Sequence, residues 1–280
     1  MARRPSFGEE PKSRLAVWSG RFGIFSLAVA ALSVVIVRSG MLEIEPSLAT
    51  FGAALVFAAL AILLAFASFI TIWRQGLSGL RSAILGLFLG ILLLAYPSYL
   101  GYRATALPAI TDITTDMDNP PRFDALSRLR PRERVNYPGA KTAALQRTAY
   151  GDIVPLQLSV TPKSAYDTAL AIINKRKWRV IDPKPPAPGR REATIEAVAQ
   201  TLIMGFRDDV IVRVVPQGQG SRVDVRSASR FGMHDFGANA TRVRALLEDI
   251  DDAAGSTPEA KPEPDKKTAP VKKGAPEKKR

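Results

Sequence analysis

The sequence predicts an α+β protein, with three N-terminal transmembrane helices followed by a mainly antiparallel sheet with helices packed on one face. Three long uncharged runs near the N-terminus predict the membrane helices, because a bilayer core is crossed by roughly 20 apolar residues. Later segments alternate between apolar and polar residues and predict strands, while two stretches with helical spacing accompany them. The order of these elements is typical of an α+β sandwich.

Composition excludes several functional classes. The 280 residues contain no cysteine, which excludes disulfides, thiolate catalysis and cysteine-ligated zinc. The net charge of +13 is spread along the chain, with 8 Lys/Arg against 4 Asp/Glu in residues 1–102, 23 against 18 in 103–252, and 8 against 4 in 253–280. Because the excess is mild everywhere and no aromatic platform lies among the arginines, we predict no nucleic-acid partner.

The uncharged runs are Phe22–Val37, which continues to Leu42 past Arg38, then Pro46–Trp73 and Ser82–Tyr102. A cleaved signal peptide is the alternative for the first run. Its charged region would be unusually long, however, and no A-x-A site follows a full-length apolar region. We therefore predict a cytoplasmic N-terminus over residues 1–20 and three transmembrane helices over residues 21–102.

Basic residues in the short flanks predict the orientation of these helices. The first loop carries Arg38 beside Glu43 and Glu45, whereas the N-terminal flank carries five basic residues, Arg3, Arg4, Lys12, Arg14 and Arg21. The positive-inside bias then predicts a multi-pass protein of the bacterial inner membrane. Its N-terminus would be cytoplasmic and its C-terminal domain periplasmic.

Two segments show no sustained apolar period. Residues 103–154 contain several prolines and predict an irregular arm. The arginines of this arm either contact anionic lipid head groups or lie on a solvated surface; they are Arg122, Arg128, Arg130, Arg132 and Arg134. Residues 253–280 are rich in Lys, Pro, Ala and Glu and predict a disordered tail.

Residues 155–252 predict the α+β domain. Strands are expected near residues 156–160, 178–182, 194–201, 209–215 and 222–227. Thr161-Pro162 is typical of a helix start, and Asp235 is a good N-cap for the last helix. The basic run Lys175–Lys177 is interpreted as the C-terminal cap of the first helix rather than a binding patch.

Period-two alternation separates the strand residues into two faces. One face is apolar, and the other carries charged residues, Glu196, Asp209, Arg213, Asp224 and Arg226. These charges either pair across adjacent strands, at about 0.2–1 kcal/mol for each pair, or form the floor of a polar pocket. In the second interpretation the pocket would be closed by Ser227, Ser229, Arg230 and His234.

A longer motif suggests a family. The segments AYGDIVPLQL (149–158), IEAVAQT (195–201), RDDVIVRV (207–214) and VDVRSASRFGMHDFGANATRVR (223–244) resemble the bacterial domain of unknown function 1499 family. The resemblance covers roughly residues 110–250, and some members carry membrane segments before the domain. The family has no established activity to carry over. The resemblance nominates Asp208 together with the candidate residues given next, His234 excepted.

The candidate ligand-binding residues are Asp209, Arg213, Asp224, Arg226, Ser227, Ser229, Arg230, His234, Asp235, Asn239 and Arg242. Arginine forks suit phosphate or carboxylate, which favours a non-enzymatic binding or envelope-organising module for an anionic ligand or lipid head group. Predicted partners are membrane lipids and an anionic ligand or envelope protein. We predict no cofactor, no metal site and no catalytic residue.

Two alternative functions and one alternative site stay open. The first is an envelope enzyme of hydrolase type, with His234 as general base and Ser227 or Ser229 as nucleophile, acting on a phosphate- or carboxylate-bearing substrate. A hard-metal site would instead need Asp208, Asp209, Asp224 and Asp235 together. The second alternative is a structural partner in a membrane complex.

Overall fold

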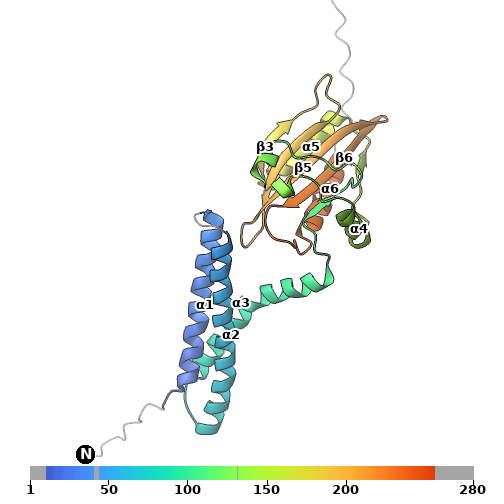
Figure 1. Cartoon of the computed structure of the whole chain (residues 1–280). Helices are drawn as coiled ribbons and strands as arrows, with labels where there is room; N and C mark the ends of the chain where they lie inside the picture. The colour runs from blue at the N-terminus through green and yellow to red at the C-terminus, as the bar shows by residue number, and fades with distance from the viewer. Residues whose placement is uncertain (1–10, 41–43, 131, 256–280) are drawn as a thin grey trace, which may run out of the picture.

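The computed structural model describes residues 11–40, 44–130 and 132–255. Figure 1 shows a bundle of long helices with a sheet-containing domain beyond one of its ends. The predicted fold class is confirmed: three long apolar helices precede a six-stranded antiparallel sheet that carries helices. Most of the predicted tail, and residues 1–10 of the predicted cytoplasmic segment, lie outside the described residues.

The bundle consists of α1 (Arg14–Ser39), α2 (Ile44–Gln75) and α3 (Leu80–Ala106). Each helix is long and apolar enough to cross a membrane. Small residues line the contacts between these helices and allow their backbones to approach closely. In lipid, helices associate through such close packing, because burial of apolar side chains gives no gain in an apolar solvent. A Cβ on Gly86 of α3 would lie 2.1 Å from Ser19 Oγ of α1, and Ser19 itself donates to the Ala61 carbonyl of α2.

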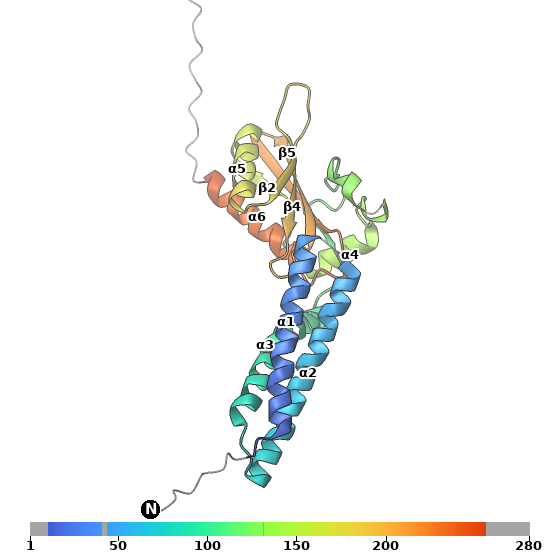
Figure 2. The same ribbon diagram turned by 90° about the vertical axis from the view of Figure 1, so that its left-hand side faces the viewer.

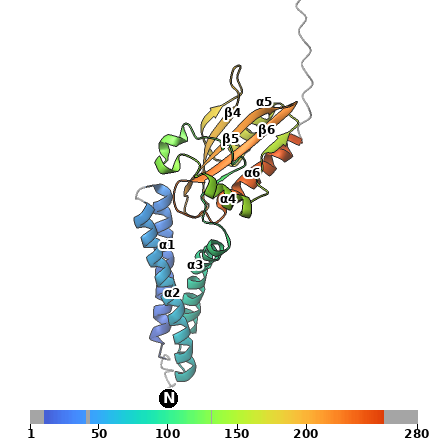
Figure 3. The ribbon, with the colours of Figure 1, turned by 45° about the vertical axis from the view of Figure 1, so that its right-hand side comes forward.

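Helix α3 leaves the bundle in its second half and runs toward the domain (Figures 1 and 3). Pro97 lies inside this helix and has no N–H to donate, which is a common cause of a bend. Tyr96, Tyr99 and Tyr102 are exposed along this half, as expected for amphipathic rings at a membrane interface.

The sheet has the order β1-β6-β5-β4-β3, and all its pairs are antiparallel. Its strands are β1 (Asp112–Thr114), β2 (Leu156–Leu158), β3 (Arg179–Lys184), β4 (Ala193–Gln200), β5 (Arg207–Gln217) and β6 (Gly220–Ser229). The short strands β1 and β2 both pair with the outer edge of β6, one beyond the other. The strand expected near residues 194–201 is confirmed as β4.

Helices α5 (Pro162–Lys175) and α6 (Ala238–Gly255) cover one face of the sheet, as Figure 2 shows with the sheet nearly edge-on. The Thr161 hydroxyl accepts from the Ser164 N–H at the start of α5, as its sequence predicts. The main core lies between these helices and the sheet, and includes Ile173, Ile195, Val212 and Leu246.

The other face of the sheet is covered by the segment between β1 and α4 (Ala140–Ala149). This segment contains two short 3₁₀ helices, η1 (Leu126–Leu129) and η2 (Arg132–Arg134). Phe123 and Leu126 pack on Val198 and Ile211 of the sheet. Residues 103–154, expected as an irregular arm, thus include the end of α3, strand β1 and helix α4, and they form one layer of the domain.

Candidate functional site

The sheet separates the candidate residues into two groups. One face of the sheet is covered by residues 115–135; we call it the polar face and these residues the covering segment. The candidates on this face are Asp209, Arg213, Asp224, Arg226 and Arg230. The others lie toward α6 and its preceding loop; they are Ser227, Ser229, His234, Asp235, Asn239 and Arg242. Successive residues of a strand point to opposite faces, so β6 alone divides the motif in two.

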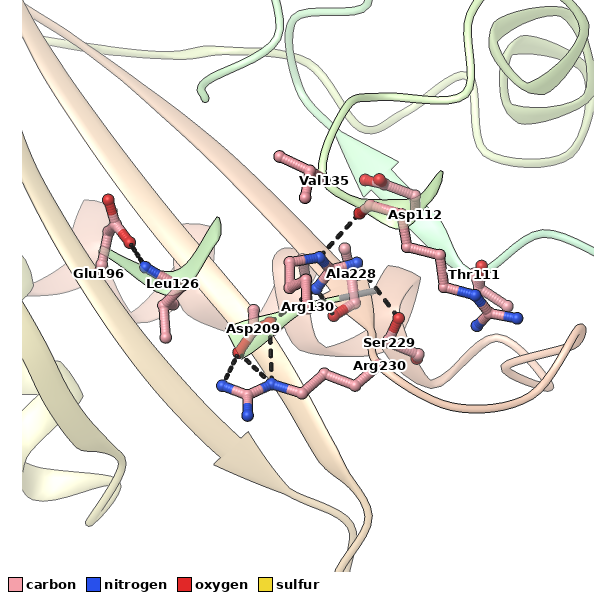
Figure 4. A network of polar contacts seen from close by, with 12 residues as sticks. Thr111, Asp112, Leu126, Arg130, Val135, Glu196, Asp209, Ala228, Ser229 and Arg230 are labelled. Carbon is pink, nitrogen blue, oxygen red and sulfur yellow. Dashed lines mark hydrogen bonds and ion pairs between the residues drawn. The ribbon is translucent and has the colours of Figure 1, made fainter. Parts of the chain in front are cut away.

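Asp209 is the centre of the first polar cluster. Its buried carboxylate accepts from Arg130 Nη1 at 2.7 Å, and from Arg230 Nε and Nη2 at 2.9 and 2.7 Å. Figure 4 shows the Arg230 guanidinium directed at Asp209. Arg130 also donates to the Ala228 and Ser229 carbonyls, so one arginine ties the covering segment to the end of β6.

A second cluster surrounds Asp224, whose side chain is fully buried. Arg213 on β5 and Arg222 on β6 both donate to it, at 2.8 and 2.9 Å. The same two arginines reach Asp116 in the covering segment. Desolvation acts in the opposite direction, but the Asn119 N–H and Arg222 hold the pKa of Asp116 below its usual value.

Arg226 is the largest fully buried side chain of the described residues. Its guanidinium forms a bidentate pair with Asp112 of β1, at 2.9 and 2.7 Å, and donates to the Pro121 carbonyl. The Phe123 ring centre lies 4.7 Å from its central carbon, in cation–π contact. The Val135 carbonyl is a further acceptor, 3.4 Å from Nη2, so Arg226 bonds to three separate segments of the covering layer and β1.

Glu196 of β4 completes the polar face. Its carboxylate accepts the backbone N–H groups of Asp124, Ala125 and Leu126, at 2.6, 3.3 and 2.8 Å. The last of these bonds is visible in Figure 4. These N–H groups lie at the start of η1 and have no acceptor within that helix. The buried Glu196 carboxylate therefore fixes the start of η1, and with it the covering segment, to the sheet.

The α6 side forms a separate network. Arg242 Nη1 donates to Ser227 Oγ at 2.9 Å, its Nη2 pairs with Asp208, and Asn239 Nδ2 donates to Ser229 Oγ. Asp235 accepts from the N–H groups of Gly237 and Asn239 at the start of α6. Burial raises the pKa of Asp235, against the lowering effect of these two N–H groups.

His234 makes no hydrogen bond to either serine hydroxyl within the described chain. Its Nδ1 accepts from the Phe236 N–H at 2.8 Å, and its Nε2 lies 3.2 Å from the Leu107 carbonyl. The two serine hydroxyls bond to Asn239 and Arg242 instead. The geometry of the hydrolase alternative is therefore not assembled in this structure.

The carboxylates of the metal alternative do not converge either. Asp209 and Asp224 lie on the polar face, whereas Asp208 and Asp235 lie on the α6 side of the sheet. Asp208, Asp209 and Asp224 each pair with arginine. Among the described ranges, no cluster of three or more His, Asp and Glu side chains could hold a metal ion.

Sequence reasoning missed four partners in these networks, Asp112, Asp116, Arg130 and Arg222. For Arg130 the expectation of a lipid-facing or solvated side chain is wrong, because its side chain is 2% exposed and bonded to Asp209. The sequence did indicate that ion pairs would form, because opposite charges occupy the polar positions of the strands. It could not indicate which segment would cover them.

The structure also shows a basic pocket of about 430 Å³ at one end of the polar face. It is lined by Leu129, Arg176, Lys177, Trp178, Arg179, Val198, Gln200, Arg207 and Arg230, with no carboxylate among them. Arg176 forms an ion pair with Asp249 and stacks on Trp178, 5.4 Å from the ring centre. Within the part of the chain that is described, Lys177, Arg179 and Arg207 make no ion pair.

The run Lys175–Lys177 was expected only to cap α5. Lys175 does lie in its last turn, but Arg176 donates to the Ala245 carbonyl of α6, and both Arg176 and Lys177 line the basic pocket. The sequence could not indicate this second role of Arg176 and Lys177. The pocket forms only when the pairing of β3, β4 and β5 brings Arg179, Gln200 and Arg207 close to the end of α5.

Solved structures with some similarity include TTHA0849 from Thermus thermophilus, at 14% identity and a TM-score of 0.22, covering 37% of this chain and 97% of that chain. CalU16 from Micromonospora echinospora matches at 10% identity and a TM-score of 0.21, covering 36% and 83% respectively. Similarity at this level says nothing about what this chain binds. No curated protein matches the chain. Residues 112–250 do match the family model described as "Protein of unknown function (DUF1499)", which confirms the resemblance, and the domain that these residues form belongs to that family.

Proposed function

We propose that this protein is a non-enzymatic, membrane-anchored module that holds a phosphate-bearing anion, supplied by a lipid head group, in the basic pocket. Its location would be the bacterial inner membrane, with the domain in the periplasm. The single observation that carries the proposal is the pocket itself: five cationic side chains and Trp178 around one cavity without a lining carboxylate. Arginine and lysine at such a site attract phosphate strongly.

The Arg/Asp motif predicted from the sequence has a structural role, which leaves ligand binding to the basic pocket. Asp209, Asp224 and Glu196 accept from arginines, a threonine or backbone N–H groups of the protein. Arg226 donates to Asp112 and to two backbone carbonyls. A buried network of this kind specifies a fold and commits its carboxylates and Arg226 to partners within the protein. The unpaired cations at its edge are therefore better placed for binding.

The position of the pocket favours a lipid over a soluble anion. Arg207 lies beside the α1 C-cap, where its Nη2 would be 4.0 Å from a Cβ on Gly40. Helix α1 is one of three helices that could span a membrane, so the pocket lies on the side of the domain nearest the predicted bilayer surface. Cationic side chains near an anionic surface contribute about 1 kcal/mol each.

Native mass spectrometry of the full-length protein tests the proposal. Phosphatidylglycerol, phosphatidylethanolamine and glycerol phosphate are added in separate arms, so that anionic lipid, zwitterionic lipid and soluble phosphate are distinguished. The double variant Arg179→Gln, Arg207→Gln should lose about 30-fold in affinity for phosphatidylglycerol, the equivalent of about 2 kcal/mol. Equal binding of glycerol phosphate and phosphatidylglycerol would point to a soluble ligand.

The matched control is Arg190→Gln, Arg191→Gln, which removes the same charge from the exposed loop at the far end of β3 and β4. It should bind phosphatidylglycerol like the parent. If both double variants bind equally, the basic pocket is not the site.

Lys177→Gly gives a second variant that does not threaten the fold. Lys177 follows α5 with a φ of 56°, a left-handed conformation that glycine adopts without steric cost. The thermal midpoint should therefore stay the same or rise, while lipid affinity should fall. Unchanged affinity in this variant would count against a role for Lys177 in binding.

A further inference from the structure

Two loops of the domain contact the ends of the membrane helices. The β4–β5 loop, residues 201–206, meets α1, where Arg38 Nη1 donates to the Leu202 and Ile203 carbonyls at 2.7 and 3.2 Å. The β6–α6 loop, residues 231–236, meets the end of α3, where His234 Nε2 lies 3.2 Å from the Leu107 carbonyl. We call these two loops the membrane-side rim; Figures 1 and 3 show this end of the domain next to the bundle.

Glycines make this close approach feasible. Gly205 has a φ of +70°, and a Cβ there would lie 3.0 Å from Arg38 Cγ. Gly237, just beyond the second loop, has a φ of +76°, and its Cβ would lie 2.7 Å from Arg103 Nη2. A side chain at either position would need an unfavourable backbone conformation and would crowd the side chains at the helix end.

The charges of α1 locate the rim relative to a bilayer. Arg21 and Arg38 bracket the uncharged run Phe22–Val37, whose 16 residues span about 24 Å as a helix. A hydrocarbon core is about 30 Å thick, so both arginines must reach its two boundaries. Because Arg38 bonds the Leu202 and Ile203 carbonyls, the first rim loop lies at the level of the lipid head groups.

The rim presents apolar side chains at this level. Leu202 is 91% exposed and Met233 is 84% exposed, the two highest values among large apolar residues of the described domain, and Ile203 is also exposed. Phe206 and Phe231 join the two loops through a ring contact of 5.6 Å. Arg207 and Arg230 directly flank these loops, which adds positive charge beside the apolar tips.

We propose that the membrane-side rim inserts Leu202, Ile203 and Met233 into the interfacial layer of the bilayer that the three helices cross. Apolar tips flanked by basic residues are the pattern of interfacial anchoring. The insertion, together with the Arg38 and Leu107 contacts, holds the domain against the membrane with the basic pocket at head-group level. This inference needs the helices to cross a membrane and does not need the pocket to bind a ligand.

Single-cysteine labelling tests the insertion, since the natural sequence contains no cysteine. Leu202→Cys and Met233→Cys place an environment-sensitive fluorophore on each exposed tip of the full-length protein in lipid nanodiscs. Some nanodiscs contain lipids with a spin-label quencher on the acyl chain close to the head group. Both labels should shift to shorter emission wavelengths and lose intensity when this quencher is present.

The matched control is Gln219→Cys in the exposed β5–β6 turn, at the opposite end of the sheet from the rim. Its label should show emission typical of water and no quenching by the lipid. Quenching at residues 202 and 233 but not at 219 supports insertion. If all three labels respond alike, the rim does not enter the bilayer, whatever the outcome of the lipid-binding experiment.

Discussion

Arg226 shows how single residues connect the layers of the domain. The side chain is 1% exposed and reaches from the centre of the sheet to Asp112, Pro121 and the Phe123 ring. A buried ion pair gives little net stability, because desolvation of both charges offsets their attraction. Removal of one partner is costly, since it leaves the other charge buried without compensation.

We therefore expect Arg226→Met to destabilise the protein by about 3–5 kcal/mol. Adding Asp112→Leu should restore most of this loss, because neither charge then remains. Thermal and denaturant unfolding of the full-length protein in detergent measures both variants. A double variant as unstable as Arg226→Met alone would show that Arg226 acts through something other than its charge pair.

Tyr137 offers a prediction about pH. Its hydroxyl is buried without a hydrogen-bond partner, and desolvation, with Asp112 nearby, raises its pKa from 10.0 to about 12. The folded state thus holds the phenol proton more tightly than the unfolded state, so this stabilisation is complete below pH 10 and is lost as pH rises through about 12. Absorbance titration of tyrosinate should show a group with a pKa of about 12 that Tyr137→Phe removes.

At neutral pH the same Tyr137→Phe variant should be stabilised by about 1 kcal/mol, because an unsatisfied buried hydroxyl is lost. The thermal midpoint measures this change. A lower midpoint in the variant would mean that the hydroxyl has a partner in solution.

Among the elements, α3 depends most clearly on residue size. Gly86 lies against the Ser19 backbone, where a Cβ would be 2.5 Å from its carbonyl carbon and oxygen, whereas a Cβ on Gly101 of the same helix would meet nothing within 4 Å. Gly86→Val should therefore cost about 1–3 kcal/mol through overpacking. Gly101→Val is the matched control. Similar losses for both variants, measured as thermal midpoints in detergent, would show that helix propensity and not packing decides the effect.

The covering segment is the element that the sequence predicted least well. Its prolines and irregular pattern indicated an arm, and Arg130 in it was expected to face lipid or water. In the structure, Glu196 holds the start of η1 and Asp209 holds Arg130 on the polar face. Local periodicity cannot detect such a segment, because its order comes from carboxylates about 70 residues away or more.

At the scale of the whole molecule, the domain and the start of α1 lie at opposite ends of the bundle (Figure 1). Lys12 bridges to Ser78, so the N-terminal segment and the α2–α3 loop share one end, while Arg38 and the domain share the other. Lys12, Arg14, Arg74 and Arg81 lie at the first end, and by the positive-inside bias this end is expected in the cytoplasm.

Paired reporter fusions test this orientation. A fusion after Gly255 should be active as alkaline phosphatase, which needs the periplasm, and dark as a cytoplasmic fluorescent reporter. A fusion after Ser78 should give the reverse result and serves as the internal control. If the Gly255 fusion reports the cytoplasm, the periplasmic placement of the domain is wrong.

The sequence by itself determined the fold class, the three apolar helices, most strands and the family. These features follow from local patterns: uncharged length, period-two alternation and a motif in the β6–α6 region. Alternation along a strand is also a local property, and it places Ser227 and Arg226 on opposite faces of β6, so a single pocket floored by Arg226 and closed by Ser227 does not form.

Only the tertiary structure decided what covers each face and which charges remain unpaired. Arg226 and Arg230 were candidates for ligand binding, yet they pair with Asp112 and Asp209, whereas Arg179 and Arg207 were not candidates and lie around the pocket without an ion pair among the described residues. The physical reason is that the environment of a charge depends on partners distant in sequence. Pairing between strands and the docking of the covering segment bring those partners together, and residue order alone does not reveal them.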